Sequence, residues 1–171
     1  YDMYLKLLEE AVLTERGEAD RLPGQCSADL TVAASISDRY VPSAEQRMDL
    51  YRKIALIRTE ADADDVTDEL IDRYGDPPRP VNNLIAVALL RSRCAENGIT
   101  ELTQKGSNVV FSLKEFDLRR VSALCGAERW KGRVLFSPGE KPALTLRLKK
   151  GEDPLKLSRV LVEDYAASEA V

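Results

Sequence analysis

Residues 69–78, with the sequence Glu-Leu-Ile-Asp-Arg-Tyr-Gly-Asp-Pro-Pro, close an amphipathic helix that is predicted from the spacing of apolar and acidic side chains. Apolar side chains recur at helical spacing on one face, at Ala63, Val66, Leu70, Ile71 and Tyr74. Acidic side chains follow an i, i+3, i+4, i+7 pattern on the other face, at Asp65, Asp68, Glu69 and Asp72. The pattern predicts one face that packs on a core and one charged face that stays in water.

Two signals fix the length of this acidic helix. Gly75 supplies the left-handed residue that commonly follows a helix, and Pro77 and Pro78 prevent the helix from resuming. At the other end, Thr59 or Asp62 is a suitable N-cap. The charged face is therefore predicted to be a shaped surface rather than a flexible acidic tail.

A second helix is predicted to precede the acidic one. Ser43 and Gln46 have the spacing of a capping box, in which each side chain bonds the free backbone N–H of the other residue. An apolar stripe at helical spacing then continues through Leu50, Tyr51, Ile54 and Ile57. We expect the two helices to form a helical hairpin.

Three further elements are predicted in the first 98 residues. Apolar residues at helical spacing predict a first helix over residues 4–16, and strict alternation over residues 30–36 predicts a half-buried strand. Pro80 suits a first helical turn, and a third, long helix is predicted to run from there to Gly98.

The pattern then changes to short apolar runs separated by turn signals. These runs predict three strands, around residues 109–113, 134–136 and 144–148. Asp117 and Asp153 are placed to cap two helices, and Pro154 suits the first turn of the second one. The strands are expected to form a small antiparallel sheet.

The predicted fold class is therefore α+β, in a single domain over residues 1–171. Its helical part, about residues 1–98, holds one strand, the helical hairpin and the long third helix. Its mixed part, about residues 99–171, holds the small antiparallel sheet and two helices. The chain opens inside an amphipathic pattern without an initiator methionine, so we expect a module of a larger protein.

The composition is typical of a globular protein, with 44% hydrophobic and 32% charged residues in a chain of 171. The longest apolar run, residues 84–90, is much shorter than the roughly 20 residues that cross a bilayer, and no signal-peptide pattern opens the chain. Cys26, Cys94 and Cys125 are odd in number and widely spaced, which predicts reduced thiols. We expect a cytoplasmic protein without membrane contact.

The net charge of −4 is distributed unevenly. Residues 1–75 carry 17 acidic and 9 basic side chains, whereas residues 76–171 carry 12 acidic and 16 basic ones. The acidic helical half is suited to partners that the basic half would repel.

The chain contains no histidine, which is the commonest general base and metal ligand. It also has no phosphate-binding loop, dinucleotide-binding glycine motif or nucleophile elbow. Carboxylate pairs such as Asp64 with Asp65 do not have the spacing of an EF-hand. We therefore expect no catalytic residue, no cofactor and no metal site in this chain.

Five short runs in the first hundred residues stand in a characteristic order. They are Tyr-Leu-Lys-Leu-Leu-Glu-Glu-Ala-Val at 4–12, Tyr-Val-Pro at 40–42, Arg-Met-Asp-Leu-Tyr-Arg-Lys-Ile-Ala at 47–55, Glu-Leu-Ile-Asp-Arg-Tyr-Gly at 69–75 and Asn-Gly-Ile at 97–99. In order and spacing, this part of the chain resembles the C-terminal domain of bacterial transcription-repair coupling factors. Residues after Gly106 match that domain only in general character.

The resemblance implies one part of a large ATP-dependent DNA translocase that removes stalled RNA polymerase and recruits excision-repair proteins. The motor is in other domains of that protein. The resemblance also implies that this domain docks in cis on a module similar to the excinuclease B subunit. There it would cover the surface that binds excinuclease A, as an autoinhibitory clamp. RNA polymerase, DNA and excinuclease A would contact other domains.

The resemblance places Glu69 and Asp72 at this contact, facing arginines of the excinuclease B-like module. Asp65 and Asp68 share their helical face by spacing alone. Arg73 is a secondary candidate, because an i, i+4 pair with Glu69 would occupy it. From the residues alone, the acidic stripe is more typical of a solvated helix face than of a docking surface. The resemblance favours a contact for Glu69 and Asp72 only.

Two alternative functions remain open. Basic side chains surround Trp130 in the mixed part, as in some nucleic-acid-binding surfaces: Lys114, Arg119, Arg120, Arg129, Lys131 and Arg133. The acidic balance of the chain argues against an accessory nucleic-acid-binding domain, and we expect Trp130 to pack in the core. An enzyme built on carboxylate pairs is the other alternative, supported only by unspecific acidic pairs.

Overall fold

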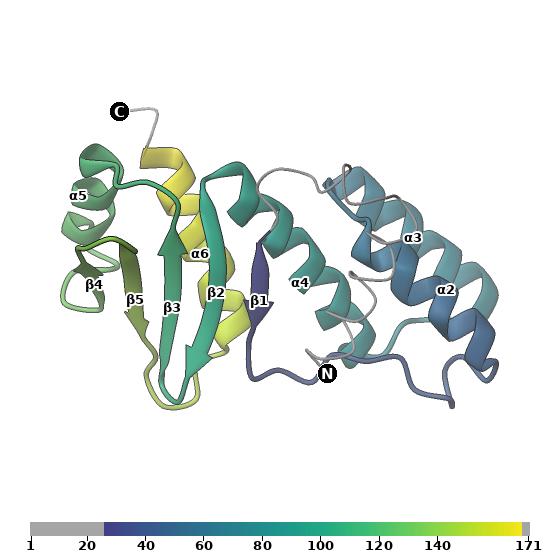
Figure 1. The fold of residues 1–171 in the computed structure, drawn as a ribbon. Helices are drawn as coiled ribbons and strands as arrows, with labels where there is room; N and C mark the ends of the chain where they lie inside the picture. Colours follow the sequence, from purple (N-terminus) through teal and green to yellow (C-terminus); the bar gives the residue numbers. More distant parts are fainter. Residues whose placement is uncertain (1–25, 169–171) are drawn as a thin grey trace. The chain divides into compact units, whose positions relative to one another are not determined.

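The computed structural model describes residues 26–168, which belong to two compact units (Figure 1). Within this range, unit one comprises residues 32–92, and unit two comprises residues 26–31 and 93–168. The helix predicted over residues 4–16 lies outside the described residues.

Unit one is helical. It contains α2 (Ala44–Ala55), α3 (Glu60–Tyr74) and the first part of α4 (Arg79–Glu96), which continues into unit two. α2 and α3 lie side by side as the predicted hairpin, joined by an ion pair between the two helices (Figure 1). The helices share one hydrophobic core, whose most deeply buried members include Leu50, Ile54, Ile57, Leu70, Val81 and Leu84.

The start of α2 confirms the predicted N-cap but only half of the predicted capping box. The Ser43 hydroxyl accepts a bond from the Gln46 backbone N–H at 3.2 Å. The Gln46 side chain has a different partner, because its Oε1 accepts a bond from the Tyr74 hydroxyl of α3 at 2.8 Å. The residue that was expected to close the box therefore links the two helices.

The strand predicted over residues 30–36 is wrong. Side-chain burial does alternate there, with Leu30, Ala34 and Ile36 buried. However, backbone groups of this segment form hydrogen bonds with helical side chains instead of with a strand. The Asn83 amide donates to the Ala33 carbonyl at 2.9 Å, and the Ile36 N–H donates to the Tyr51 hydroxyl at 2.8 Å. The segment pairs with no strand among the described residues, and the true strand, β1 (Ser27–Asp29), lies just before it.

Unit two is built on a five-stranded sheet with the order β1-β2-β3-β5-β4. Its other strands are β2 (Ile99–Lys105), β3 (Asn108–Leu113), β4 (Val134–Ser137) and β5 (Ala143–Arg147). The three strands predicted from apolar runs are confirmed as β3, β4 and β5. The sheet is nevertheless larger than predicted, and it is mixed, because β1 pairs with β2 in parallel while the remaining pairs are antiparallel.

Two capped helices complete unit two. Asp117 caps α5 (Leu118–Gly126) by accepting from the Arg120 N–H at 3.2 Å. Asp153 caps α6 (Pro154–Ala167) by accepting from the Leu155 N–H at 2.9 Å, so both predicted caps are confirmed. α6 passes behind the strands in the view of Figure 1. The large fully buried side chains of the unit include Leu102, Phe111 and Leu144 from the strands, Leu124 from α5, Trp130 after α5 and Leu161 from α6.

The observed elements confirm the predicted α+β class. No helix within residues 26–168 combines the length and the apolar character needed to cross a membrane.

Candidate protein-docking surface

The N-terminus of α3 is fixed by a complete capping box. The Thr59 hydroxyl accepts from the Asp62 N–H at 3.1 Å, and Asp62 Oδ2 accepts from the backbone N–H groups of Arg58 and Thr59 at 2.9 and 3.2 Å. These backbone bonds, of which the one from Arg58 has the largest effect, lower the pKa of the Asp62 carboxyl below its ordinary value. Both residues that the sequence offered as caps therefore hold this end of the helix.

The C-terminus of α3 is fixed at Gly75 and Tyr40. Gly75 has a φ of 86°, a left-handed conformation that stops the helix as predicted. The Tyr40 hydroxyl donates to the Gly75 carbonyl at 2.7 Å, and its oxygen also lies 3.4 Å from the Leu70 carbonyl. Burial is the main reason that the pKa of Tyr40 is raised. α3 is thus a helix held at both ends.

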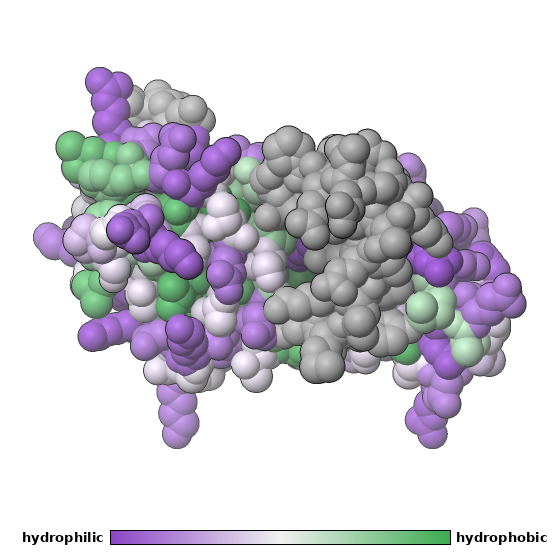
Figure 2. Space-filling view, in the orientation of Figure 1, coloured by the Kyte–Doolittle hydropathy of each residue, from purple (hydrophilic) through white to green (hydrophobic). Residues whose placement is uncertain are grey.

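Three of the predicted site residues form what we call the acidic face of α3: Asp65, Asp68 and Asp72. All three side chains are exposed, and none forms an ion pair with another residue of the described range. Around α2 and α3, Figure 2 shows a surface dominated by hydrophilic side chains. Because nothing in the described part of the chain neutralises these carboxylates, they are available to a basic partner.

Glu69 differs from these three carboxylates, because it is already paired within unit one. The Lys53 ammonium of α2 donates to both carboxylate oxygens of Glu69, at 2.7 and 3.0 Å. Arg73 lies 4.0 Å away in the i, i+4 pair that the sequence predicts, and its guanidinium also lies over the Tyr74 ring at 5.2 Å. Glu69 and Arg73 therefore stabilise the hairpin locally, a role for Glu69 that the sequence analysis missed.

Ile71 was predicted to face the core, and this is wrong. Its side chain is 43% exposed, whereas the neighbouring Leu70 is 0% exposed. At 100° per residue, Ile71 falls between the buried face and the acidic face, since it follows Asp68 by three positions. α3 therefore presents an apolar side chain at the border of its carboxylates.

A hollow of about 590 Å³ lies beside the hairpin in unit one. Its charged lining has both signs, with Glu45, Asp49, Arg52, Lys53 and Arg73. Arg52 lies 3.6 Å from Asp49, and Lys53 is bound to Glu69. Because the opposite charges largely offset each other, this hollow does not select an anion or a cation.

The basic cluster around Trp130 in unit two does not form an aromatic platform. Trp130 is 0% exposed, as expected, and its indole N–H donates to Asp164 Oδ2 at 2.7 Å. Arg129 lies 3.1 Å from the same carboxylate oxygen, and Arg133 forms an ion pair with Glu152. A buried ring cannot stack on a base.

Arg120, another member of that cluster, is buried. It is 9% exposed and its guanidinium lies over the Tyr165 ring at 5.1 Å. Four members of the cluster, Lys114, Arg119, Arg129 and Lys131, remain exposed, and Arg129 is paired with Asp164. Much of the charge in this part of unit two is thus used in internal contacts, which weakens the nucleic-acid alternative.

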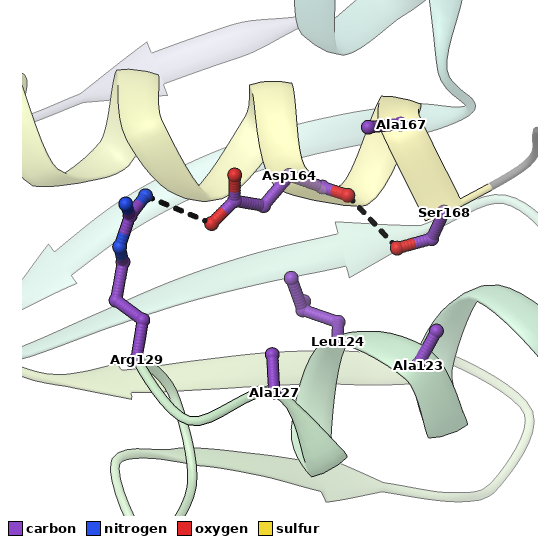
Figure 3. Close-up of a pocket in the computed structure, with 7 residues that line it drawn as sticks. All are labelled: Ala123, Leu124, Ala127, Arg129, Asp164, Ala167 and Ser168. Atoms are coloured by element: carbon purple, nitrogen blue, oxygen red, sulfur yellow. Dashed lines mark hydrogen bonds and ion pairs between the residues drawn. The ribbon is translucent and has the colours of Figure 1, made fainter.

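A second hollow, of about 430 Å³, opens between α5 and α6 (Figure 3). It is lined mainly by small and apolar side chains: Ala123, Leu124, Ala127 and Ala167. Its polar groups are already bonded, because Asp164 accepts from Arg129 and the Ser168 hydroxyl donates to the Asp164 carbonyl at 2.8 Å. This arrangement has no nucleophile with an adjacent base.

The described residues bring no group of three or more potential metal-binding side chains together. Within residues 32–92, the acidic face of α3 gathers exposed side chains of one charge sign on a helix that is held at both ends. The site residues Asp65, Asp68 and Asp72 are brought together by this helix, while Glu69 and Arg73 lie beside them and face inward to the hairpin.

Comparison with known proteins relates this chain to one family. The family model described as the TRCF domain matches residues 30–122. The match covers α2, α3 and α4 and extends through β2 and β3 into α5.

Curated relatives are transcription-repair-coupling factors from staphylococci. The protein of Staphylococcus haemolyticus is 30% identical over 115 residues, which is 66% of this chain and 10% of that protein. The protein of Staphylococcus epidermidis is 26% identical over 178 residues, which is 100% of this chain and 15% of that protein. This chain therefore spans between a tenth and a sixth of the length of these relatives.

A solved structure has the same fold. The crystal structure of the C-terminal domain of transcription-repair coupling factor matches with a TM-score of 0.74 and 18% sequence identity. The match covers 86% of this chain and 95% of that one.

Proposed function

Because this chain belongs to the TRCF domain family, we propose that it is a non-catalytic regulatory domain that docks on an excinuclease B-like module of its own protein. In this position it masks the surface of the module that recruits excinuclease A. The domain is thus an autoinhibitory lid in transcription-coupled DNA repair.

The proposal is supported by the three unpaired carboxylates of the acidic face of α3. Asp65, Asp68 and Asp72 lie exposed on a single helix that is fixed at both ends, without an ion-pair partner in the described part of the chain. Carboxylates arranged in this way are suited to arginines, which bind them through two parallel, charge-assisted hydrogen bonds. The structure therefore supports a partner surface that is basic.

The energetics of exposed ion pairs suit a lid that has to open. Each such pair contributes about 1 kcal/mol or less, so three of them bias a docked state without making it permanent. Complementary charges also speed the encounter and fix the orientation of the two surfaces more than they raise affinity. A lid held in this way can be released when another part of the protein engages its own partner.

The remainder of the protein supplies the other activities in this proposal. The relatives are about seven to ten times as long as the matched segment, which leaves room for a motor and for surfaces that contact RNA polymerase, DNA and excinuclease A. We assign none of these contacts to residues 1–171, and we propose that both units act together as one domain in the bacterial cytoplasm.

The test is binding of this chain to the isolated excinuclease B-like module, measured by calorimetry. Asp72→Lys should weaken binding at least tenfold, because it places a positive charge against a basic surface. Glu140→Lys is the matched control, since it makes the same change at an exposed position of unit two. Equal binding by wild type and Asp72→Lys, with both folded, would exclude the acidic face as the contact.

A further inference from the structure

Ile71 is the exposed large apolar side chain of α3. Four other large apolar side chains in the described range have comparable or lower burial, namely Leu56, Phe116, Leu118 and Leu135. None of them lies on α3. Among these five side chains, Ile71 is the one that adjoins the acidic face, because it follows Asp68 by three positions on the same helix.

The backbone beneath Ile71 is rigid. Leu70, the preceding residue, is fully buried in the core of unit one, and the Ile71 carbonyl accepts from the Gly75 N–H at 3.0 Å. Tyr40 holds the same turn through the Gly75 carbonyl at 2.7 Å. The Ile71 side chain is therefore presented to solvent at a fixed place, so little order has to be gained when a partner covers it.

This combination of an apolar side chain with surrounding charges is typical of a protein contact. Binding energy in interfaces concentrates on a few side chains that become fully desolvated, and charged groups around them set orientation and exclude water. Exposed carboxylate pairs contribute little affinity by themselves. An acidic face alone would give a weak and unspecific contact with any basic surface.

We propose that Ile71 is the apolar anchor of the docking surface. The partner then presents basic side chains around one apolar side chain, which packs on Ile71 while the basic groups pair with Asp68 and Asp72. The choice of partner follows from charge complementarity with these unpaired carboxylates. The inference rests on the proposed function and specifies the chemistry of the surface that the lid covers.

The test compares Ile71→Ala with wild type in the same calorimetric titration of the excinuclease B-like module. We expect about tenfold weaker binding, since the change removes most of the apolar area that the contact would bury. The salt dependence of binding should stay that of wild type, because no charge is altered. Ile71→Leu, which keeps the apolar volume, should restore most of the affinity.

Two controls separate a contact from a structural effect. Leu135→Ala removes an apolar side chain that is 46% exposed, close to the 43% of Ile71, but lies on β4 in unit two, and it should bind as wild type. Thermal unfolding of Ile71→Ala should be unchanged or slightly improved, because alanine is the better helix former.

The outcomes distinguish the inference from the function on which it rests. If Ile71→Ala binds as wild type while Asp72→Lys binds weakly, the apolar anchor is excluded and the docking function stands. If wild type does not bind the module at all, both the docking function and the role of Ile71 as its apolar anchor are contradicted. Weaker binding by both variants, with Leu135→Ala unaffected, supports both proposals.

Discussion

Glu69 and Asp72 lie three positions apart on one helix, but only the Glu69 side chain forms an ion pair within the described residues. Glu69 is held by Lys53 at 2.7 Å and stabilises the α2–α3 hairpin, whereas Asp72 projects into solvent. The motif in which both occur therefore combines a residue that stabilises the hairpin, Glu69, with a residue of the proposed docking surface, Asp72. Charge reversal at Glu69 would mix these two effects, so Asp72 is the better position for testing docking.

Neutral variants should separate the effect of Glu69 on stability from the effect of Asp72 on docking. Glu69→Gln is expected to lower the free energy of unfolding by about 1 kcal/mol or less, because it weakens a partly exposed ion pair, and to reduce docking only slightly. Asp72→Asn should leave stability unchanged and weaken docking more. Urea unfolding and calorimetry of both variants check this, and the opposite order of effects would show that Glu69 is the contact.

Tyr40 is a second supporting residue, and its hydroxyl can be removed alone. Tyr40→Phe should cost about 0.5–1.5 kcal/mol of unfolding free energy, because the Gly75 carbonyl loses its 2.7 Å bond. Tyr74→Phe is the matched control. Its hydroxyl bonds the mobile end of one side chain, Gln46, and no backbone carbonyl at the end of α3, so a smaller loss is expected in thermal unfolding. Equal losses would mean that Tyr40 does not fix the end of α3.

Among the elements, α3 depends most on its caps, because its buried stripe is narrow. Thr59→Ala should destabilise unit one by about 1 kcal/mol, since it removes half of the capping box. Thr67→Ala makes the same change in the middle of the helix, where the hydroxyl bonds only the Ala63 carbonyl, and should cost much less. Urea unfolding followed by helical circular dichroism measures both, and a Thr67 loss as large as that of Thr59 would contradict this role of the cap.

Helix ends were predictable from sequence because the signals are local. Ser43, Thr59, Asp117 and Asp153 each cap the helix that follows, as their spacing indicated. The strands were harder to predict, because their signal depends on pairing with distant segments. In β2, a register shift between Ile99 and Glu101 breaks the alternation, so only Ile99 and Leu102 are buried and no period of two can be read.

The candidate site was predictable only in part, for a similar reason. Exposure of Asp65, Asp68 and Asp72 follows from helical spacing within one element. The Lys53 to Glu69 pair joins residues 16 positions apart, and only the geometry of the turn between α2 and α3 brings them together. Ile71 lies at the edge of the buried stripe, where spacing alone does not decide between core and surface.

For the chain as a whole, carboxylates held by hydrogen bonds determine the response to acid. The pKa of Glu163 is lowered chiefly by bonds from the Arg93 guanidinium, at 2.7 and 2.9 Å. The pKa of Glu152 is lowered first by the Lys149 N–H and then by Arg133, and that of Asp62 by the capping box. A carboxyl with a lower pKa in the folded state stabilises the fold above its unfolded pKa of about 4.

This stabilisation is lost as the pH falls through the lower pKa values of the folded state. We therefore expect the free energy of unfolding to be nearly constant just below neutral pH and to fall below about pH 4. Glu163→Gln should be less stable than wild type at neutral pH, and its stability should fall less steeply in acid. Urea unfolding across this range checks the prediction, and parallel pH curves for the two proteins would contradict it.

In the proposed function, docking through exposed carboxylates would give the chain a simple means of regulation. The acidic face and Ile71 belong to one rigid helix, so the lid needs no rearrangement within unit one to bind or to leave. Its affinity is expected to be modest and sensitive to salt, as for other exposed charge pairs.

In the proposed function, this chain covers the surface of the excinuclease B-like module that recruits excinuclease A. The most direct measurement is therefore competition: excinuclease A binding to the excinuclease B-like module, measured while this chain is added in increasing amounts. We predict that wild type displaces excinuclease A and that Asp72→Lys does not. Formation of a ternary complex, with this chain and excinuclease A bound to the module together, would contradict the claim.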